Sequence, residues 1–355
     1  MDKVLMKGNE ALAEAAIRAG CKHFFGYPIT PQTEVSAYMA KKLPKIGGTF
    51  LQAESEVAAI NMVMGASAAG IRAMTSSSSP GISLKSEGIS YIAGCDLPCL
   101  IINVQRGGPG LGGIQPSQSD YNQATKAPGH GDFHLFVLAP SSVQEMVEFV
   151  GEAFDLAEIY RMPAMILADG ILGQMMEPVS FNEIKKRSVP EKTWAAEGHK
   201  NMRTHNIINS LILKPELLEK SNFDRFERYK LLAEKEQRYE EYLMEDAEIV
   251  IVAFGVSARV AKSGINKARE QGIKVGLIRP ITLYPFPVNA FLKVQDNPKV
   301  HTLLTVEMNM GQMIYDVKLA INCKKPVELL NHTGGIVPSP KEVYERIKKI
   351  AEVNK

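Results

Sequence analysis

Glu56 has the type and position of a residue that could do chemistry. It begins a predicted helix, residues 56–69, that otherwise consists almost wholly of apolar and small residues, so we expect this helix to be buried on all sides. The ordinary explanation is that a carboxylate at a helix N-terminus is stabilised by the helix dipole. A buried carboxylate nevertheless destabilises a fold unless it meets a partner. Glu56 is therefore a candidate functional acid, whereas we expect Glu54 to be exposed.

Arg106 is the second candidate, because it follows a predicted buried strand, residues 99–104, and begins the glycine-rich segment RGGPGLGGIQ. Three of these glycines match the G-x-G-x-x-G pattern of dinucleotide sites. However, the polar, proline-containing segment that follows opens no helix, and no acidic residue ends a following strand at the expected distance. A flexible ligand-binding loop with one cation at its base and a plain surface loop both fit this pattern.

Hydroxyl groups stand at the ends of two other predicted strands. A strand over residues 23–27 leads to Thr30, the expected N-cap of the next helix, with Pro31 as its first helical residue. The serine run 76–79 follows a strand over residues 71–75 and lacks the lysine of a P-loop, so a turn whose hydroxyls bond the backbone is the simpler interpretation. Because open α/β sheets bind ligands at the carboxyl ends of their strands, we expect Thr30 and Arg106 to converge.

The composition excludes several classes of function. Hydrophobic residues make up 45% of the 355-residue chain, which is enough for a sizeable core, and the net charge of +2 comes without any basic block, which argues against nucleic acid as the main partner. We expect no signal peptide, because the first residues contain no apolar core, and the sequence contains no apolar run of membrane-spanning length. Its four cysteines form no CxxC pair, so we expect a cytoplasmic protein that binds no iron–sulfur cluster on its own.

Strands alternate with helices in both halves of the chain, which predicts an α/β fold with two domains. We expect a first domain with a parallel sheet over residues 1–178 and a second over residues 246–355. The connecting segment, 179–245, should contain a charged helix over residues 224–245 that is either solvated or packed on a partner chain. Several helices should have side-chain caps, and the predicted capping residues are Asn9, Ser55, Ser142, Ser257 and Ser339.

Eight stretches carry a resemblance to a known family. The first domain contains, in order, GYPITPQTE, LQAESEVAAINMVMGASAAG, TSSSSPGISLKSEGISYIAG and INVQRGGPGLG, and the second adds VAFGVSARVAK, VGLIRPITLYPFP, VEMNMGQM and NHTGG. Together they resemble the α-type subunit of the 2-oxoacid:ferredoxin oxidoreductases, in the pyruvate:ferredoxin oxidoreductase superfamily, over essentially the whole chain. The resemblance implies a thiamine diphosphate enzyme with a pyrimidine-binding first domain and a second domain similar to the C-terminal domain of transketolase.

The resemblance also implies roles for individual residues. Glu56 matches the glutamate that hydrogen-bonds N1′ of the aminopyrimidine ring, a role in which burial keeps the proton affinity of the carboxyl group high. Arg106 matches the arginine that meets the substrate carboxylate with its planar fork, and Thr30 matches a hydroxyl group that approaches the substrate. The other residues implied in cofactor binding are Tyr27, Pro28 and Ser79.

The absence of one motif indicates that this chain needs a partner subunit. Thiamine diphosphate enzymes hold the diphosphate and its metal with a G-D-G motif, which this sequence lacks. The resemblance therefore implies that this chain supplies half of a site and no metal ligand. A β-type subunit would supply the diphosphate site, Mg²⁺ and a [4Fe-4S] cluster, and ferredoxin-like γ- and δ-type subunits would complete the complex. The implied reaction is oxidative decarboxylation of a 2-oxoacid, which forms an acyl-coenzyme A and passes electrons to ferredoxin.

The loop after Arg106 suggests the substrate. Gly110 and Leu111 stand where members similar to the 2-oxoglutarate type carry Ser and Thr, so the loop is more similar to the branched-chain type, which uses 2-oxoisovalerate (3-methyl-2-oxobutanoate). Three alternatives remain: a 2-oxoglutarate-type subunit, a nucleotide-binding dehydrogenase that uses the glycine-rich loop, and a non-catalytic subunit that recruits partners through the helix at 224–245.

Overall fold

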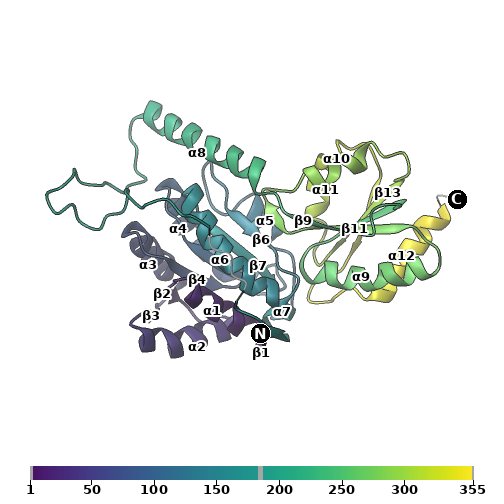
Figure 1. The fold of residues 1–355 in the computed structure, drawn as a ribbon, viewed down its shortest axis with the longest axis horizontal. Helices are drawn as coiled ribbons and strands as arrows, with labels where there is room; N and C mark the ends of the chain where they lie inside the picture. Colours follow the sequence, from purple (N-terminus) through teal and green to yellow (C-terminus); the bar gives the residue numbers. More distant parts are fainter. Residues whose placement is uncertain (1–2, 183–186, 354–355) are drawn as a thin grey trace.

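A seven-stranded sheet forms the core of the N-terminal part of the protein (Figure 1). The structure is a computed structural model that describes residues 3–182 and 187–353. The strand order is β12–β6–β7–β5–β4–β2–β3, and all neighbours are parallel except β12, which runs antiparallel to β6. The strands are β2 (His23–Gly26), β3 (Thr49–Gln52), β4 (Ala73–Ser77), β5 (Leu100–Gln105), β6 (Phe136–Leu138), β7 (Ala164–Asp169) and β12 (Thr282–Tyr284). The carboxyl ends of β2, β4 and β5 lie side by side, as the ligand-binding prediction requires.

Helices and one small antiparallel pair complete this part. The pair is β1 (Val4–Lys7) with β8 (Met176–Val179), and the helices are α1 (Gly8–Arg18), α2 (Thr33–Lys42), α3 (Glu56–Ala68), α4 (Ser79–Gly94), α5 (Tyr121–Thr125), α6 (Val143–Tyr160) and α7 (Gly170–Gln174), with a 3₁₀ turn, η1 (Leu43–Ile46). Two predicted caps are confirmed. Ser55 Oγ accepts a hydrogen bond from the Ala58 amide at 3.1 Å, and Ser142 Oγ accepts one from the Glu145 amide at 3.1 Å.

Two predictions about these helices are wrong. Asn9 does not cap α1; it lies inside the helix, and its buried side chain donates hydrogen bonds to the carbonyl of Pro31 at 2.8 Å and to Glu34 at 2.9 Å. Nor is α3 buried on all sides, because the face that carries Val57 is open and this side chain is 43% exposed. The apolar composition of α3 therefore exceeds what this chain alone covers.

A five-stranded sheet forms the C-terminal part, which lies beside the N-terminal part in Figure 1. Its order is β14–β13–β10–β11–β9, parallel except for the edge strand β9. The elements are β9 (Tyr239–Tyr242), β10 (Ile249–Val252), β11 (Val275–Pro280), β13 (Thr302–Glu307), β14 (Val327–Asn331), α9 (Gly255–Glu270), α10 (Asn289–Gln295), α11 (Met313–Ala320) and α12 (Pro340–Val353). The predicted α/β class is confirmed.

Of the two helix caps predicted in this part, one is confirmed and the other is wrong. Ser339 caps α12 as predicted, since its Oγ accepts a hydrogen bond from the Glu342 amide at 3.2 Å. Ser257 does not cap α9, because that helix already begins at Gly255. The Ser257 hydroxyl instead donates a hydrogen bond to Gln118 Oε1 at 2.7 Å, across the contact between the two parts.

The predicted helix at 224–245 is displaced. The observed helix, α8 (Pro215–Lys235), runs along the outside of the N-terminal part (Figure 1). It ends before Tyr239–Tyr242 because those residues form β9, antiparallel to β11, and tyrosine favours such an edge strand. Residues 183–186 of the connecting segment lie outside the described residues. None of the described helices is long and apolar enough to cross a membrane.

Candidate functional site

Three of the predicted site residues are in direct contact at the carboxyl ends of the parallel strands. Arg106 follows β5, and its Nη1 donates a hydrogen bond to the carbonyl of Thr30, in the segment after β2, at 3.1 Å. The Arg106 main-chain amide donates to Ser79 Oγ at 3.0 Å, and Ser79 begins α4, separated from the end of β4 by Ser78 alone. Segments more than 20 residues apart in the chain thus meet at one edge of the sheet, as expected from the parallel order.

Thr30 is exposed and does not cap α2, contrary to the prediction. The helix begins at Thr33, and the N-cap position belongs to Gln32. The side chain of Gln32 is buried, and its Oε1 accepts a hydrogen bond from the Ser76 hydroxyl at 2.5 Å, so a contact to β4 fixes the start of α2. Within the described part of the chain, the Thr30 hydroxyl makes no hydrogen bond and remains available to a ligand.

Arg106 is 7% exposed, and two backbone carbonyls fix its guanidinium group. Besides the bond to Thr30, its Nη2 donates to the carbonyl of Leu111 at 3.1 Å. Its Nε is buried and has no hydrogen-bond partner among the described residues. The glycine-rich loop closes on itself beside it, with the Gly113 amide donating to the carbonyl of Gly107 at 2.8 Å. Gly112 has a φ of 58°, and a Cβ there would stand 1.8 Å from that carbonyl oxygen, so this turn requires glycine.

Glu56 is 6% exposed and lies against Gly81, the third residue of α4. A Cβ at Gly81 would stand 2.7 Å from Glu56 Oε1 and 2.1 Å from Ser77 Oγ, so the missing side chain makes room for both groups. The hydroxyls of Ser77 and Ser78 are buried without a hydrogen-bond partner in the described structure. The prediction that the hydroxyls of the serine run bond the backbone is therefore wrong for these two residues. The structure gives no direct contact between Glu56 and Arg106.

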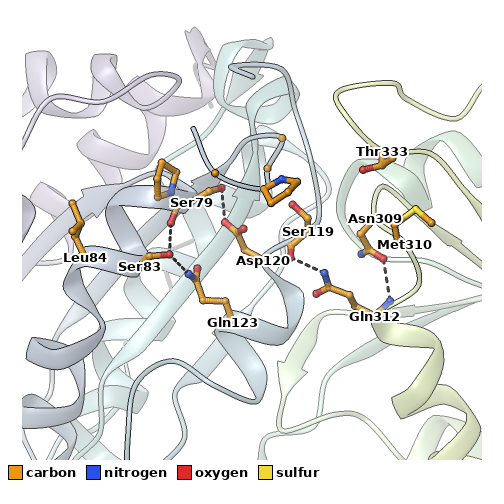
Figure 2. Close-up of a pocket in the computed structure, with 15 residues that line it drawn as sticks. Ser79, Ser83, Leu84, Ser119, Asp120, Gln123, Asn309, Met310, Gln312 and Thr333 are labelled. Carbon is orange, nitrogen blue, oxygen red and sulfur yellow. Dashed lines mark hydrogen bonds between the residues drawn. The ribbon is translucent and has the colours of Figure 1, made fainter. Parts of the chain in front are cut away.

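A pocket of about 650 Å³ adjoins Ser79 and the glycine-rich loop, between the N- and C-terminal parts (Figure 2). One wall consists of the start of α4 and the glycine-rich loop, and the other of the segment after β13. The side chains labelled in Figure 2 are Ser79, Ser83, Leu84, Ser119, Asp120 and Gln123 from the N-terminal part and Asn309, Met310, Gln312 and Thr333 from the C-terminal part. Among the predicted site residues, Ser79 lines this pocket, whereas Thr30, Glu56 and Arg106 do not. Tyr27 and Pro28 are exposed and do not line it either.

Asp120 is a residue of this pocket that the sequence reasoning missed. Its Oδ2 accepts hydrogen bonds from Ser79 Oγ at 2.6 Å and from Asn103 Nδ2 at 2.9 Å. Burial raises the pKa of Asp120 above its usual value, although these two hydrogen bonds act in the opposite direction. No local pattern could have found it, because its partners lie on β5 and α4.

Gln118 joins the two parts beside the pocket. Its side-chain Nε2 donates to the carbonyl of Phe254 at 2.9 Å, and its main-chain carbonyl accepts from Asn309 Nδ2 at 2.9 Å. Glu307 holds the opposite wall, because its buried carboxylate accepts hydrogen bonds from three amides at the start of α11, at 2.8 to 3.0 Å. Burial raises the pKa of Glu307. The wall that faces the glycine-rich loop is thus fixed by side-chain to main-chain bonds.

The chain matches two sequence families along its length. Residues 14–243 match the family described as "Pyruvate flavodoxin/ferredoxin oxidoreductase, thiamine diP-bdg", and residues 247–343 match "Pyruvate:ferredoxin oxidoreductase core domain II". The chain is 49% identical to the ketoisovalerate oxidoreductase subunit VorB of Methanothermobacter marburgensis, over 98% of this chain and 97% of that protein. It is 38% identical to the 2-oxoglutarate synthase subunit KorA of Methanocaldococcus jannaschii, over 96% of this chain and 98% of that protein.

Two solved structures have similar folds. One is the 2-oxoglutarate:ferredoxin oxidoreductase from Magnetococcus marinus with 2-oxoglutarate, coenzyme A and succinyl-CoA bound, with a TM-score of 0.84 and 28% identity. The match covers 98% of this chain and 65% of that one, so this chain spans just under two thirds of its length. The other, a split-gene transketolase in an inactive β4 tetramer, has a TM-score of 0.61 at 15% identity and shares the fold alone. The chain therefore belongs to the pyruvate:ferredoxin oxidoreductase family, with that family's thiamine-diphosphate-binding module and its core domain II.

Proposed function

We propose that this protein is the α-type subunit of a 2-oxoacid:ferredoxin oxidoreductase that converts 2-oxoisovalerate and coenzyme A to an acyl-coenzyme A and passes the electrons to ferredoxin. One observation carries the proposal: Glu56 leads α3 as a buried carboxylate and lies in the space left by Gly81. This is the place at which the family resemblance puts the cofactor's pyrimidine ring. The 49% identity to the ketoisovalerate oxidoreductase subunit supports the branched-chain substrate.

The residues around Glu56 fit the aminopyrimidine half of thiamine diphosphate. The hydroxyls of Ser77 and Ser78 are buried donors without partners in the described structure, and the missing side chain at Gly81 lets the Glu56 carboxylate lie beside Ser77. Glu56 would hold a proton at the ring nitrogen N1′, and Ser79, Tyr27 and Pro28 would line the cofactor site. The bound cofactor supplies the electron sink for decarboxylation.

Arg106 would bind the substrate carboxylate. The carbonyls of Thr30 and Leu111 hold its guanidinium group in one orientation, and the unpartnered Nε is a further donor. A guanidinium fixed in this way loses little conformational entropy when it binds a planar carboxylate. The exposed Thr30 hydroxyl would make a second contact to the substrate.

The substrate side chain would extend toward the glycine-rich loop. Leu111 is 81% exposed there and would cover a branched apolar group. The described residues that line the adjoining pocket include no lysine or arginine, and their one carboxylate is Asp120. A second carboxylate on the substrate would meet like charge and find no cation in this lining, so the chemistry favours 2-oxoisovalerate over 2-oxoglutarate.

Partner subunits would complete the site in the cytoplasm. The open apolar face of α3, with Val57, and the exposed Leu84 on α4 flank the proposed cofactor position. We propose that a β-type subunit covers this surface and supplies the diphosphate site, Mg²⁺ and the nearest [4Fe-4S] cluster. Ferredoxin-like γ- and δ-type subunits would carry electrons onward to ferredoxin.

The test uses the complex co-expressed with its partner subunits. The wild-type complex should reduce ferredoxin with coenzyme A and 2-oxoisovalerate faster than with 2-oxoglutarate or pyruvate. Glu56→Gln should lower the rate by roughly 10²- to 10⁴-fold, the range of general acid–base catalysis. The exposed neighbour Glu54 provides a matched control, so Glu54→Gln should leave the rate unchanged.

Other outcomes would favour the alternatives. A preference for 2-oxoglutarate would refute the substrate assignment. Tight NADH binding with no activity toward 2-oxoacids would favour a nucleotide-binding dehydrogenase. Full activity after Glu56→Ala and Arg106→Ala together would favour a non-catalytic assembly role.

A further inference from the structure

The face of α4 that packs against α3 carries Gly81, Lys85 and Gly88, which are spaced by four and three residues and so lie on one side of the helix. Gly81 lies against Glu56, and a Cβ at Gly88 would stand 2.4 Å from Ile60 Cγ2. The two glycines let α4 and α3 approach each other closely on either side of Lys85 along the helix. A lysine at the centre of such a contact is unusual, because ammonium groups are almost never fully buried without a partner.

Lys85 is fully buried, and its Nζ donates a hydrogen bond to the main-chain carbonyl of Glu56 at 3.3 Å. Burial lowers the pKa of Lys85 to about 8, and the charge of Glu56 acts in the opposite direction. No other charged side chain is found to shift the pKa of this ammonium group within the described residues. A methionine would fill the same space without the desolvation cost, so packing alone does not account for the lysine.

We propose that Lys85 is a positioning residue for proton transfer at Glu56, which it serves by anchoring the first turn of α3 through the bond to the Glu56 carbonyl and by placing a buried positive charge at that turn. This inference rests on the proposed function, because it assumes that Glu56 exchanges a proton with the cofactor. Lys85 itself touches neither cofactor nor substrate.

The charge acts on the position of one proton. A nearby cation stabilises the ionised form of a carboxyl group and makes the group a stronger acid. With the cofactor bound, this charge would favour the arrangement in which the proton exchanged between Glu56 and the ring nitrogen N1′ lies on the nitrogen. No bond other than this O–H to N–H exchange is involved, and no electrons are transferred. The hydrogen bond to the Glu56 carbonyl keeps the carboxylate at the same place against Gly81 in each turnover.

The experiment compares Lys85→Met with Ile89→Met in the full complex. Both residues are fully buried on α4, but Ile89→Met changes no charge. Lys85→Met should lower kcat by roughly 10- to 100-fold, which is less than the loss expected from Glu56→Gln, and should leave the KM for the 2-oxoacid unchanged. Near-ultraviolet circular dichroism of the bound thiamine diphosphate should report the altered ring protonation without turnover.

The melting temperature separates this role from a structural one. Removing a buried ammonium should leave the Tm of Lys85→Met equal to that of the wild type or higher. A lower Tm with parallel losses of cofactor binding and activity would overturn the proposal, as would an unchanged dichroism spectrum. If Lys85→Met behaves as wild type while Glu56→Gln is inactive, the proposed function stands and the role of Lys85 falls. If the wild-type complex binds no thiamine diphosphate, both fall.

Discussion

Replacing Gly81 by alanine should separate the placement of Glu56 from the stability of the fold. The added Cβ would stand 2.1 Å from Ser77 Oγ and 2.7 Å from Glu56 Oε1, so both groups must move. Overpacking of this kind costs about 1–3 kcal/mol. Alanine regains about 1 kcal/mol over glycine in a helix. We therefore expect Gly81→Ala to destabilise the protein by about 0–2 kcal/mol, a fall in Tm of a few degrees.

Gly88→Ala is the matched control, because it adds the same methyl group to the same face of α4. Its Cβ would stand 2.4 Å from Ile60 Cγ2, and it touches no group of the proposed site. The two variants should therefore have similar Tm values in thermal unfolding. Only Gly81→Ala should lose activity in the complex, by about 100-fold, because a displacement of about 1 Å at a reacting group has an effect of that size.

Two results would refute this reasoning. One is a Gly81→Ala complex with the wild-type rate, which would mean that the position of the Glu56 carboxylate does not matter. The other is an equal loss of activity in Gly88→Ala, which would trace the loss to helix packing in general.

Three further predictions concern other residues. Arg106→Lys should lower kcat/KM for the 2-oxoacid by roughly 10- to 100-fold, because an ammonium group cannot bind both carboxylate oxygens as the planar guanidinium group does. Steady-state kinetics that match the wild type would contradict this. Thr30→Val should weaken substrate binding whereas Thr30→Ser should not, and neither should change the Tm, because the hydroxyl caps no helix. Burial raises the pKa of Asp169 from 3.8 to about 6, so the folded protein holds the Asp169 proton more tightly than the unfolded chain does. The stabilisation of the folded state by this proton is complete below about pH 4 and is lost as the pH rises through about 6. Asp169→Asn should remove this loss, at most about 3 kcal/mol, and urea unfolding at about pH 4 and about pH 7 measures it.

Local signals predicted helix caps only where no distant partner competed. Ser55, Ser142 and Ser339 cap their helices through amides three residues onward. Asn9 and Ser257 have equally suitable side chains but bond to Glu34 and Gln118, which are distant in sequence. Polar side chains choose between local and tertiary partners, and a sequence pattern contains only the local choice. The predicted end of the helix at 224–245 was wrong for the same reason, because pairing with β11 outcompetes helix formation after residue 235.

The candidate site was predictable in outline. The contact of Thr30, Arg106 and Ser79 follows from the rule that parallel strands end at one edge of the sheet. Asp120 and Lys85 were not predictable, since each is significant only through neighbours on other elements. A single aspartate in a polar loop or a single lysine in a helix carries no signal until the fold supplies its surroundings.

Strand β12 has a consequence for how the chain is made and cut. This short strand lies between β11 and α10 in the sequence, yet it supplies the outermost strand of the N-terminal sheet, antiparallel to β6. A fragment that stops at residue 245 would leave the backbone groups along one side of β6 exposed to water and to other chains. During synthesis, the first sheet acquires its last strand only after most of the chain has left the ribosome. The two halves of this protein should therefore fold as interdependent units, and the N-terminal half expressed alone should aggregate unless residues 282–284 are provided.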